Sequence, residues 1–177
     1  LLNVLSLCSA VHDASHGAFD PTVQPLWSAM ANGATGAEVE DARTAVGFEA
    51  VRFDTTEVRF TGAVPGRALT LNGIAQGAIT DRVSALLRQH GLRDVLIDMG
   101  EIAALGTKGD GTPWQAGIAD PSGRLHQRVS LSDRALATSA PMGMMVRNQG
   151  HILHPSGTPT THVLASVSAP TAAVADG

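Results

Sequence analysis

The stretch that decides the fold is NGIAQGAITDRVSALLRQHG, residues 72–91, in which a glycine-bounded loop runs into a helix. The apolar residues after the loop recur at helical spacing, at Ile79, Val83, Leu86 and Leu87. Gly91 follows at the position where a left-handed residue commonly ends a helix. The pattern therefore predicts one amphipathic helix whose buried face is this apolar stripe.

The loop at the start of this helix is also a candidate binding site. Gly73 and Gly77 allow the backbone to approach a phosphate closely, and the free amides of a helix start favour anions. The spacing of the glycines matches neither of the standard nucleotide-binding motifs. A phosphate site and a tight turn between a strand and a helix both stay open at this point.

Helical patterns dominate the chain before this stretch, and strand patterns dominate after it. The predicted helices are residues 1–14, with Cys8 buried, then 22–30, 37–46 and a last one at 171–176. The predicted strands are a hairpin at 49–53 and 57–61, then 68–71, 95–99, 102–105, 114–119, 125–131, 134–138, 144–147 and 163–168. This order indicates an α+β fold, and the absence of a linker-like segment favours a single domain over residues 1–177.

Composition excludes several classes of partner for this 177-residue chain. Lys and Arg number 12 against 16 Asp and Glu, the net charge is −4, and no basic run occurs, so a nucleic-acid partner is not expected. Aromatic residues make up only 3%, too few for a base-stacking platform. A single cysteine excludes an internal disulfide and a cysteine-cage zinc site.

Three histidines near the C-terminus are candidates for chemistry. His151 and His154 are three residues apart, and His162 is nearby. They are compatible with a zinc site, or with one imidazole that acts as a general base near neutral pH. The turn at residues 155–157 favours a third interpretation, surface histidines beside a loop.

Carboxylates near glycines or element ends form a second set of candidates, because Mg²⁺ prefers oxygen ligands of this kind. The set is Asp20, Asp81, Asp98, Glu101, Asp120 and Asp176. Structural roles compete with metal binding for three of them. Asp20 and Asp81 are placed to cap helices, and Asp120 begins an Asp-Pro turn.

Taken together and in order, seven motifs resemble the ApbE family, whose members are FAD:protein FMN transferases. The motifs are SHGAFDPTVQPLW at 15–27, LNGIAQGA at 71–78 with Asp81, DMGEI at 98–102, WQAGIADP at 114–121, ATS at 137–139, HILHPSG at 151–157 and AD at 175–176. The resemblance implies a T-fold-related α+β domain with N-terminal helices and a mainly antiparallel sheet. It also implies a chain that lacks both family termini.

The resemblance further implies a chemistry and a set of site residues. Family members bind FAD and Mg²⁺, cleave the pyrophosphate and join the FMN phosphate to a threonine or serine hydroxyl of a target flavoprotein. His151 is implied as the catalytic base, and the Gly73 carbonyl and the Asp176 carboxylate as metal ligands. The implied FAD contacts are Ala18, Phe19, Asp20, Thr70, Gln76 and Gly150.

Departures from the family pattern define the alternative function. Thr70 stands where the family usually has Asp, Gln76 where it has Lys or Glu, Ala140 where it has Gly, and His154 where it has Asp. A non-catalytic flavin-binding or accessory protein of the same fold is therefore the second hypothesis. The resemblance also implies a location on the periplasmic side of the bacterial inner membrane, with an export signal or lipid anchor outside these residues.

Overall fold

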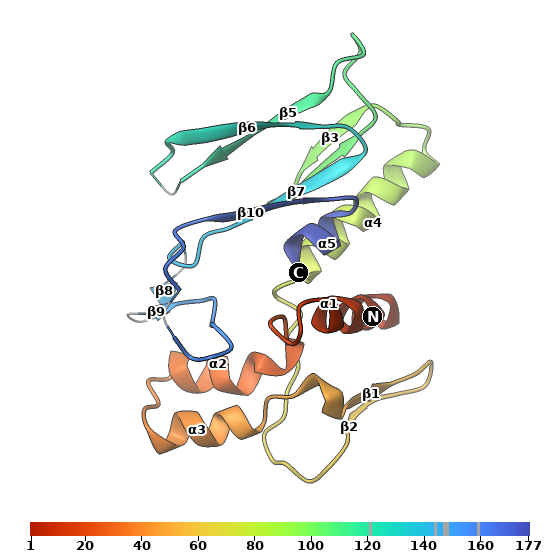
Figure 1. The fold of residues 1–177 in the computed structure, drawn as a ribbon. Helices are drawn as coiled ribbons and strands as arrows, with labels where there is room; N and C mark the ends of the chain where they lie inside the picture. Colours follow the sequence, from red (N-terminus) through yellow and green to blue (C-terminus); the bar gives the residue numbers. More distant parts are fainter. Residues whose placement is uncertain (121, 144, 147–148, 159) are drawn as a thin grey trace. The chain divides into compact units, whose positions relative to one another are not determined.

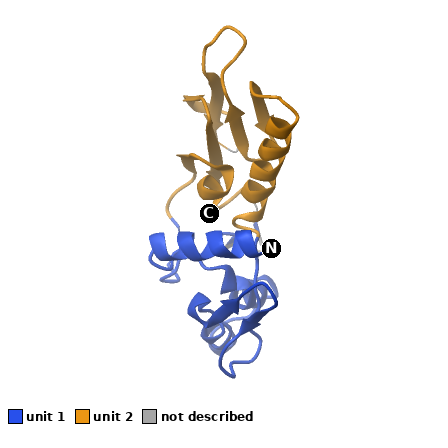
Figure 2. Cartoon of the chain, turned by 90° about the vertical axis from the view of Figure 1, so that its right-hand side faces the viewer, with its two compact units in different colours: residues 1–71, 144–160 blue, residues 72–143, 161–177 orange. Residues whose placement is uncertain are grey.

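The computed structural model describes residues 1–120, 122–143, 145–146, 149–158 and 160–177. The chain forms two compact units that interleave along the sequence (Figure 2). Unit 1 comprises residues 1–71 and 144–160, and unit 2 comprises residues 72–143 and 161–177. Within the described residues, no helix has both the length and the apolar character needed to cross a membrane. The expectation of a single domain stays a prediction.

Unit 1 is built mainly from helices. Its elements are α1 (Leu2–Ala14), the 3-10 turn η1 (Pro21–Val23), α2 (Gln24–Ala31), α3 (Ala37–Thr44), η2 (Phe48–Ala50) and the strands β1 (Val51–Phe53), β2 (Val58–Phe60), β8 (Met145–Val146) and β9 (Gln149–Gly150) (Figure 1). Leu5 and Cys8 of α1 are fully buried, as predicted for Cys8. Burial raises the pKa of the Cys8 thiol to about 11, which leaves it protonated and unreactive at neutral pH.

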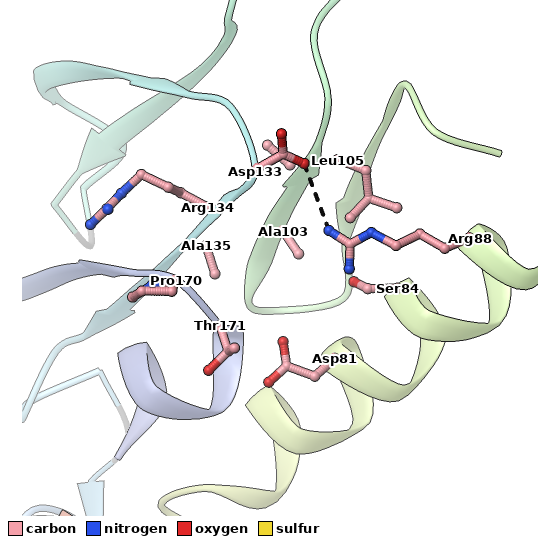
Figure 3. Close-up of a pocket in the computed structure, with 11 residues that line it drawn as sticks. Asp81, Ser84, Arg88, Ala103, Leu105, Asp133, Arg134, Ala135, Pro170 and Thr171 are labelled. Atoms are coloured by element: carbon pink, nitrogen blue, oxygen red, sulfur yellow. Dashed lines mark ion pairs between the residues drawn. The ribbon is translucent and has the colours of Figure 1, made fainter.

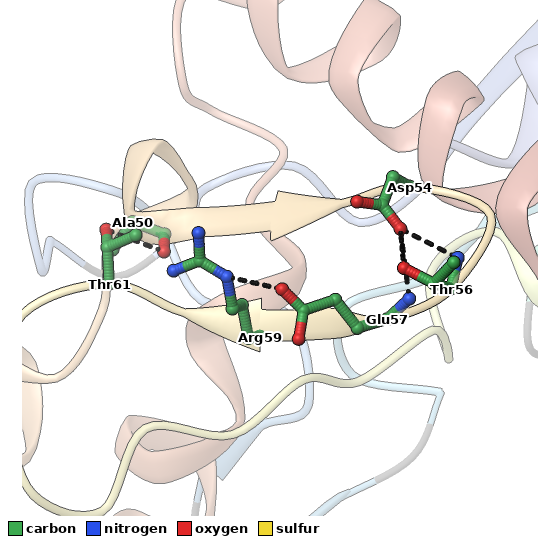
Figure 4. Close-up of polar contacts among 6 residues, drawn as sticks. All are labelled: Ala50, Asp54, Thr56, Glu57, Arg59 and Thr61. Atoms are coloured by element: carbon green, nitrogen blue, oxygen red, sulfur yellow. Dashed lines mark hydrogen bonds and ion pairs between the residues drawn. The ribbon is translucent and has the colours of Figure 1, made fainter.

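The predicted hairpin of unit 1 is present as β1 paired antiparallel with β2. Its turn is closed by Asp54 Oδ1, which accepts hydrogen bonds from the amide and hydroxyl of Thr56 at 2.7 and 2.6 Å and from the Glu57 amide at 3.1 Å (Figure 4). These hydrogen bonds lower the pKa of Asp54. At the other end, the Thr61 amide donates to the Ala50 carbonyl at 2.7 Å, so the hairpin is fixed at both ends.

Unit 2 is a three-layer arrangement around an antiparallel sheet. The sheet has the order β10-β7-β4-β3, formed by Ala165–Ala169, Arg134–Ser139, Ile102–Leu105 and Val95–Asp98. The helices α4 (Ala75–Gln89) and α5 (Ala172–Asp176) lie side by side on one face (Figure 1). The hairpin of β5 (Trp114–Ala119) and β6 (Leu125–Leu131) covers the other. The predicted α+β class with an antiparallel sheet is confirmed.

Side-chain alternation along the strands explains the layers. Ala103 and Leu105 of β4 pack with the helices, whereas Ala104 between them packs with Leu131 of the β5–β6 hairpin. The helix-facing cluster consists largely of small side chains, which allow a helix to lie close to the sheet. Its buried members are Ile97, Ala103, Leu105, Ala135, Ala137, Ala169, Ala172 and Ala175.

The predicted buried stripe of α4 is wrong in part. Val83 and Leu87 pack against the core, but Ile79 and Leu86 are 56% and 51% exposed. The buried positions of the helix are small or hydroxyl-bearing instead: Gly77, Thr80 and Ser84.

Close packing of α4 against α5 explains this difference. A Cβ on Gly77 would lie 2.5 Å from the Ala172 carbonyl oxygen and 2.7 Å from the Ala173 Cα, so the two backbones are in direct contact. Thr80 satisfies its buried hydroxyl by donating to the Gln76 carbonyl at 3.0 Å, and Ser84 by donating to the Thr80 carbonyl at 2.9 Å. Bulky apolar residues would hold the helices apart.

Two strand predictions also need correction. Residues 68–71 form no strand, because the Thr70 amide donates to the Pro21 carbonyl at 2.7 Å rather than to a neighbouring strand. The last strand begins at Ala165, two residues later than predicted. The strand predicted at 144–147 lies partly outside the described residues, which place Met145–Val146 in β8.

Replacing Gly77 by Ala tests the contact between the two helices. Alanine favours a helix by about 1 kcal/mol over glycine, but a methyl group pressed against backbone costs about 1–3 kcal/mol, and we expect the clash to dominate. Thermal or urea unfolding of Gly77→Ala should show a net loss of stability. The matched control is Gly109→Ala, whose Cβ meets nothing within 4 Å; it should be neutral or slightly stabilising. Equal stabilities for the two variants would contradict the packing described.

Candidate functional site

In unit 1, Asp20 organises the first motif, and the prediction that it caps a helix is confirmed. Its Oδ1 accepts hydrogen bonds from the Thr22 amide at 2.7 Å and the Thr22 hydroxyl at 2.6 Å. Its Oδ2 accepts from the Phe48 amide at 3.3 Å. Thr22 is fully buried, and its hydroxyl accepts from the Gly47 amide at 2.7 Å. Asp20 therefore fixes the backbone of its own segment and ties it to residues 47–48.

The segment before Asp20 is held by the end of α1. The Phe19 amide donates to Ser15 Oγ at 3.0 Å, and the Phe19 carbonyl lies 2.8 Å from His12 Nδ1. The His12 ring also lies against the Phe48 ring, with centroids 5.3 Å apart. Ala18 is exposed at the tip of this turn. Hydrogen bonds to Ser15 and His12 therefore fix the backbone of this loop, and the small side chain of Ala18 lies at its surface.

Thr70 joins this segment from fifty residues further along the chain. Its amide donates to the Pro21 carbonyl, directly after Asp20, and its side chain is half-buried. Four of the residues implied as FAD contacts, Ala18, Phe19, Asp20 and Thr70, therefore lie in one region of unit 1.

The predicted catalytic histidine also belongs to unit 1. Gly150 ends β9, which pairs antiparallel with β8, and His151 follows directly; both are half-buried. Whether His151 and Phe19 share a cleft stays a prediction. His154 closes a turn instead, because its Nδ1 lies 2.7 Å from Ser156 Oγ and accepts from the Ser156 amide at 3.2 Å.

The structure gives no support to a three-histidine zinc site. His154 and His162 are both exposed, and His151 is half-buried. Across the part of the chain that the structure describes, no three His, Cys, Asp or Glu side chains are arranged to hold a metal ion. His154 Nδ1 is already hydrogen-bonded within its own turn, so this nitrogen is not free to bind a metal ion.

In unit 2, the two residues implied as metal ligands are associated with the same end of α4. The Gly77 amide, in the first turn of the helix, donates to Asp176 Oδ2 at 2.9 Å across 99 residues of sequence. Asp176 is half-buried, and burial raises its pKa against the opposing effect of this hydrogen bond. Gly73 is exposed in the turn that precedes the helix. The carboxylate and the carbonyl of this turn provide the oxygen ligands that hard cations prefer.

Gln76 connects the helix start to a second motif. Its Nε2 donates to the Met99 carbonyl at 2.8 Å, and a Cβ on Gly100 would overlap the Gln76 amide. Gly100 also has a φ of +99°, a conformation that favours glycine. The motifs at 71–78 and 98–102, separate in sequence, therefore meet at this side chain.

The sequence predicts no specific role for Glu101, one of the candidate carboxylates, but the structure gives it a distinctive position. It is 8% exposed, and its Oε2 is buried without a hydrogen-bond partner. Burial, and secondly the charge of Asp176, raise its pKa to about 7, while a hydrogen bond from the Thr138 backbone acts in the opposite direction. The one feature of the sequence that could have indicated this position is an acidic residue directly before a predominantly buried strand, β4.

Asp81 caps a helix as predicted, but the helix is α5 rather than its own. Its Oδ1 and Oδ2 accept from the Ala172 and Ala173 amides at 2.8 and 2.9 Å. Asp120 closes its Asp-Pro turn as predicted, by accepting from the Ser122 hydroxyl at 2.5 Å. Hydrogen bonds from Ser122 and His126 lower the pKa of Asp120 to about 2. Both carboxylates thus have structural roles.

A separate cavity of about 220 Å³ opens between α4, β4, β7 and the turn into α5 (Figure 3). Its charged groups already have partners. Arg88 pairs with Asp133 at 3.7 Å, and Arg134 donates to the Ser168 carbonyl at 2.9 Å. The residues implied as flavin or metal contacts do not line it, so the cavity is distinct from the candidate site.

The fold is that of a solved flavin transferase. The solved structure of the flavin transferase ApbE from Vibrio cholerae aligns with this chain at a TM-score of 0.82 and 25% identity, covering 99% of this chain and 61% of that one. The family model described as the ApbE family matches residues 1–177, and the chain belongs to this family.

Two curated relatives are both named FAD:protein FMN transferase. The one from Klebsiella pneumoniae is 26% identical over 198 residues, covering 100% of this chain and 57% of the relative. The one from Haemophilus influenzae is 28% identical over 196 residues, covering 98% and 57%. The chain therefore spans little more than half the length of these relatives.

The raised pKa of Glu101 predicts how stability changes with pH. Between its ordinary value of 4.5 and about 7, folded Glu101 keeps a proton that the unfolded chain loses. The free energy of unfolding should therefore fall as pH rises through this range, by about 1–2 kcal/mol after allowance for solvent screening. Asp176 acts in the same direction, whereas the lowered pKa of Asp120 acts at more acidic pH.

Urea unfolding at pH 4.5 to 8 in the presence of a chelator measures this effect. Glu101→Gln should flatten the dependence, because glutamine does not titrate. A parent protein whose stability is constant or increases over this range would contradict the assigned environment of Glu101.

Proposed function

We propose that the protein to which this chain belongs transfers FMN from FAD to a threonine or serine hydroxyl of a target flavoprotein and releases AMP. The names of the relatives that match almost the whole chain support this activity. The observation that carries it within the molecule is the hydrogen bond from Gly77 to Asp176. It brings together the glycine motif and the last motif, from which the implied metal ligands come.

Magnesium is part of the proposal, and the residues present fit it. Asp176 is half-buried with one oxygen held by a backbone amide, and Gly73 lies in the turn just before the same helix. Oxygen donors of these two kinds suit Mg²⁺. Bound there, the ion would neutralise negative charge on the pyrophosphate, the main requirement of phosphoryl transfer.

The other residues bind and orient the reactants in this proposal. The flavin contacts in this proposal are Ala18, Phe19, Asp20, Thr70 and Gly150 in unit 1 and Gln76 in unit 2. The hydroxyl oxygen of the acceptor attacks the phosphorus of the FMN half while His151 accepts the hydroxyl proton. A new phosphoester bond forms, and the bond to the AMP half breaks with its electron pair leaving on AMP.

A non-catalytic flavin-binding or accessory role is the second candidate. The observation that favours it is the Gln76 side chain, which stands where the family usually has a charged residue and donates to the Met99 carbonyl. In this alternative the protein binds FAD but does not cleave it.

We propose that the protein acts on the periplasmic side of the bacterial inner membrane. An export signal or lipid anchor outside these residues is part of this proposal. Family resemblance supports this location. Fractionation of cells that express the full coding sequence would test it.

Incubation of the intact protein with FAD, Mg²⁺ and a threonine-bearing target flavoprotein separates the two candidates. We expect AMP release together with covalent flavin on the target. FAD binding without either product would favour the accessory role and overturn the transferase.

Replacing His151 by Ala tests the assigned base. We expect transfer to slow by about 10²–10⁴-fold, the usual contribution of a general base, with FAD binding retained. His162→Ala serves as the matched control, because His162 is an exposed histidine to which the proposal gives no role. Transfer at the parental rate by His151→Ala would show that His151 is not the base.

A further inference from the structure

Glu101 is the feature of unit 2 that neither the fold nor the proposed function has yet explained. A carboxylate that is 8% exposed normally has partners for both oxygens, yet Oε2 has no hydrogen-bond partner. Leaving a charged oxygen buried and unsatisfied is costly, and a second carboxylate nearby adds repulsion. Such an arrangement persists where a bound group compensates for it.

The side chains around the start of α4 place two carboxylates at one site. The Gln76 amide is bonded to the Met99 carbonyl and packs over Gly100, which fixes the segment leading into Glu101. The next residue, Gly77, holds Asp176 through its amide. Adjacent residues of one helical turn therefore hold the segment before Glu101 and the carboxylate of Asp176.

Compensation by a basic side chain is not observed. Among the described residues, the ion pairs are Arg43 with Glu40, Arg59 with Glu57, Arg88 with Asp133 and His126 with Asp120, and none includes Glu101 or Asp176. Within the part of the chain that the structure describes, a bound cation and a shared proton are two ways to offset the charge.

We propose that Glu101 is a further ligand of the divalent cation, supplying its unpartnered Oε2 beside the Asp176 carboxylate. The identity of the cation as Mg²⁺ or a similar hard ion rests on the proposed function. Two carboxylates leave coordination positions for the carbonyl of the Gly73 turn and for phosphate oxygens of FAD. Such a site uses only two carboxylate side chains. It is therefore compatible with the finding that no three His, Cys, Asp or Glu side chains in the described residues are arranged to hold a metal ion.

Manganese binding to the intact protein tests the proposal without relying on activity. Mn²⁺ is a spectroscopic substitute for Mg²⁺, and paramagnetic resonance of the free ion gives the Kd directly. We expect Glu101→Gln to weaken Mn²⁺ binding at least about tenfold and to reduce the rise in Tm that Mn²⁺ produces. The matched control is Asp41→Asn, which removes an exposed carboxylate of α3 that has no role in the proposal, and its Kd should stay within about twofold of the parent.

Stability without the cation distinguishes a ligand from a purely structural residue. At pH 8 in chelator, Glu101→Gln should unfold no earlier than the parent, because it removes an unsatisfied buried charge. A large loss of Tm in chelator, with unchanged Mn²⁺ affinity, would identify a structural role and overturn the proposal. Glu101→Asp, which keeps the charge on a shorter side chain, gives a second measurement if the glutamine variant does not fold; parental Mn²⁺ affinity in it would also count against direct ligation.

The outcomes for cation binding and for FMN transfer are separable. Parental Mn²⁺ affinity in Glu101→Gln would favour a shared proton between the two acids, even where the parent transfers FMN. Weakened Mn²⁺ binding in that variant, with no transfer by the parent, would support the cation site and overturn the proposed function.

Discussion

The direct backbone contact between α4 and α5 is the constraint on which unit 2 depends. Gly77 permits it, because any side chain there would collide with the Ala172 carbonyl. α5 has only five residues, too short to be stable alone, and α4 holds it near both ends. Asp81 accepts from the amides at its N-terminus, and the Gly77 amide donates to Asp176 at its C-terminus.

This arrangement connects stability to the candidate site. The hydrogen bond that anchors the end of α5 is made by Asp176, an implied metal ligand. Helix packing therefore sets the position of the carboxylate, and the short helix gives it little freedom to move. The acid pair with Glu101 is a consequence, because β4 carries Glu101 immediately before its first residue, Ile102, and packs under the same helices.

Local features of this fold could be predicted from sequence, and features set by tertiary contact could not. Asp20 was recognised as a cap because an Asp before Pro-Thr is sufficient to form one. Asp81 was expected to cap a helix, but its partner lies 91 residues away and leaves no local signal. The sequence does not predict which face of α4 is buried. Gly77, Thr80 and Ser84 follow the same helical period as the apolar stripe, and only packing against α5 selects between the two faces.

The family motifs predict the site residues, but they do not single out Glu101. Its burial in the folded chain is what distinguishes it from the other candidate carboxylates.

The departure from the family pattern at position 76 changes the charge beside the cation site proposed above. Glutamine keeps an N–H donor for the Met99 carbonyl, as lysine would, so the segment before Glu101 stays in place. Unlike lysine, it brings no positive charge to the two acids. A glutamate there would have no proton to donate and would add a third negative charge. The neutral residue therefore preserves the geometry and leaves the charge of Glu101 and Asp176 to be balanced by a bound group.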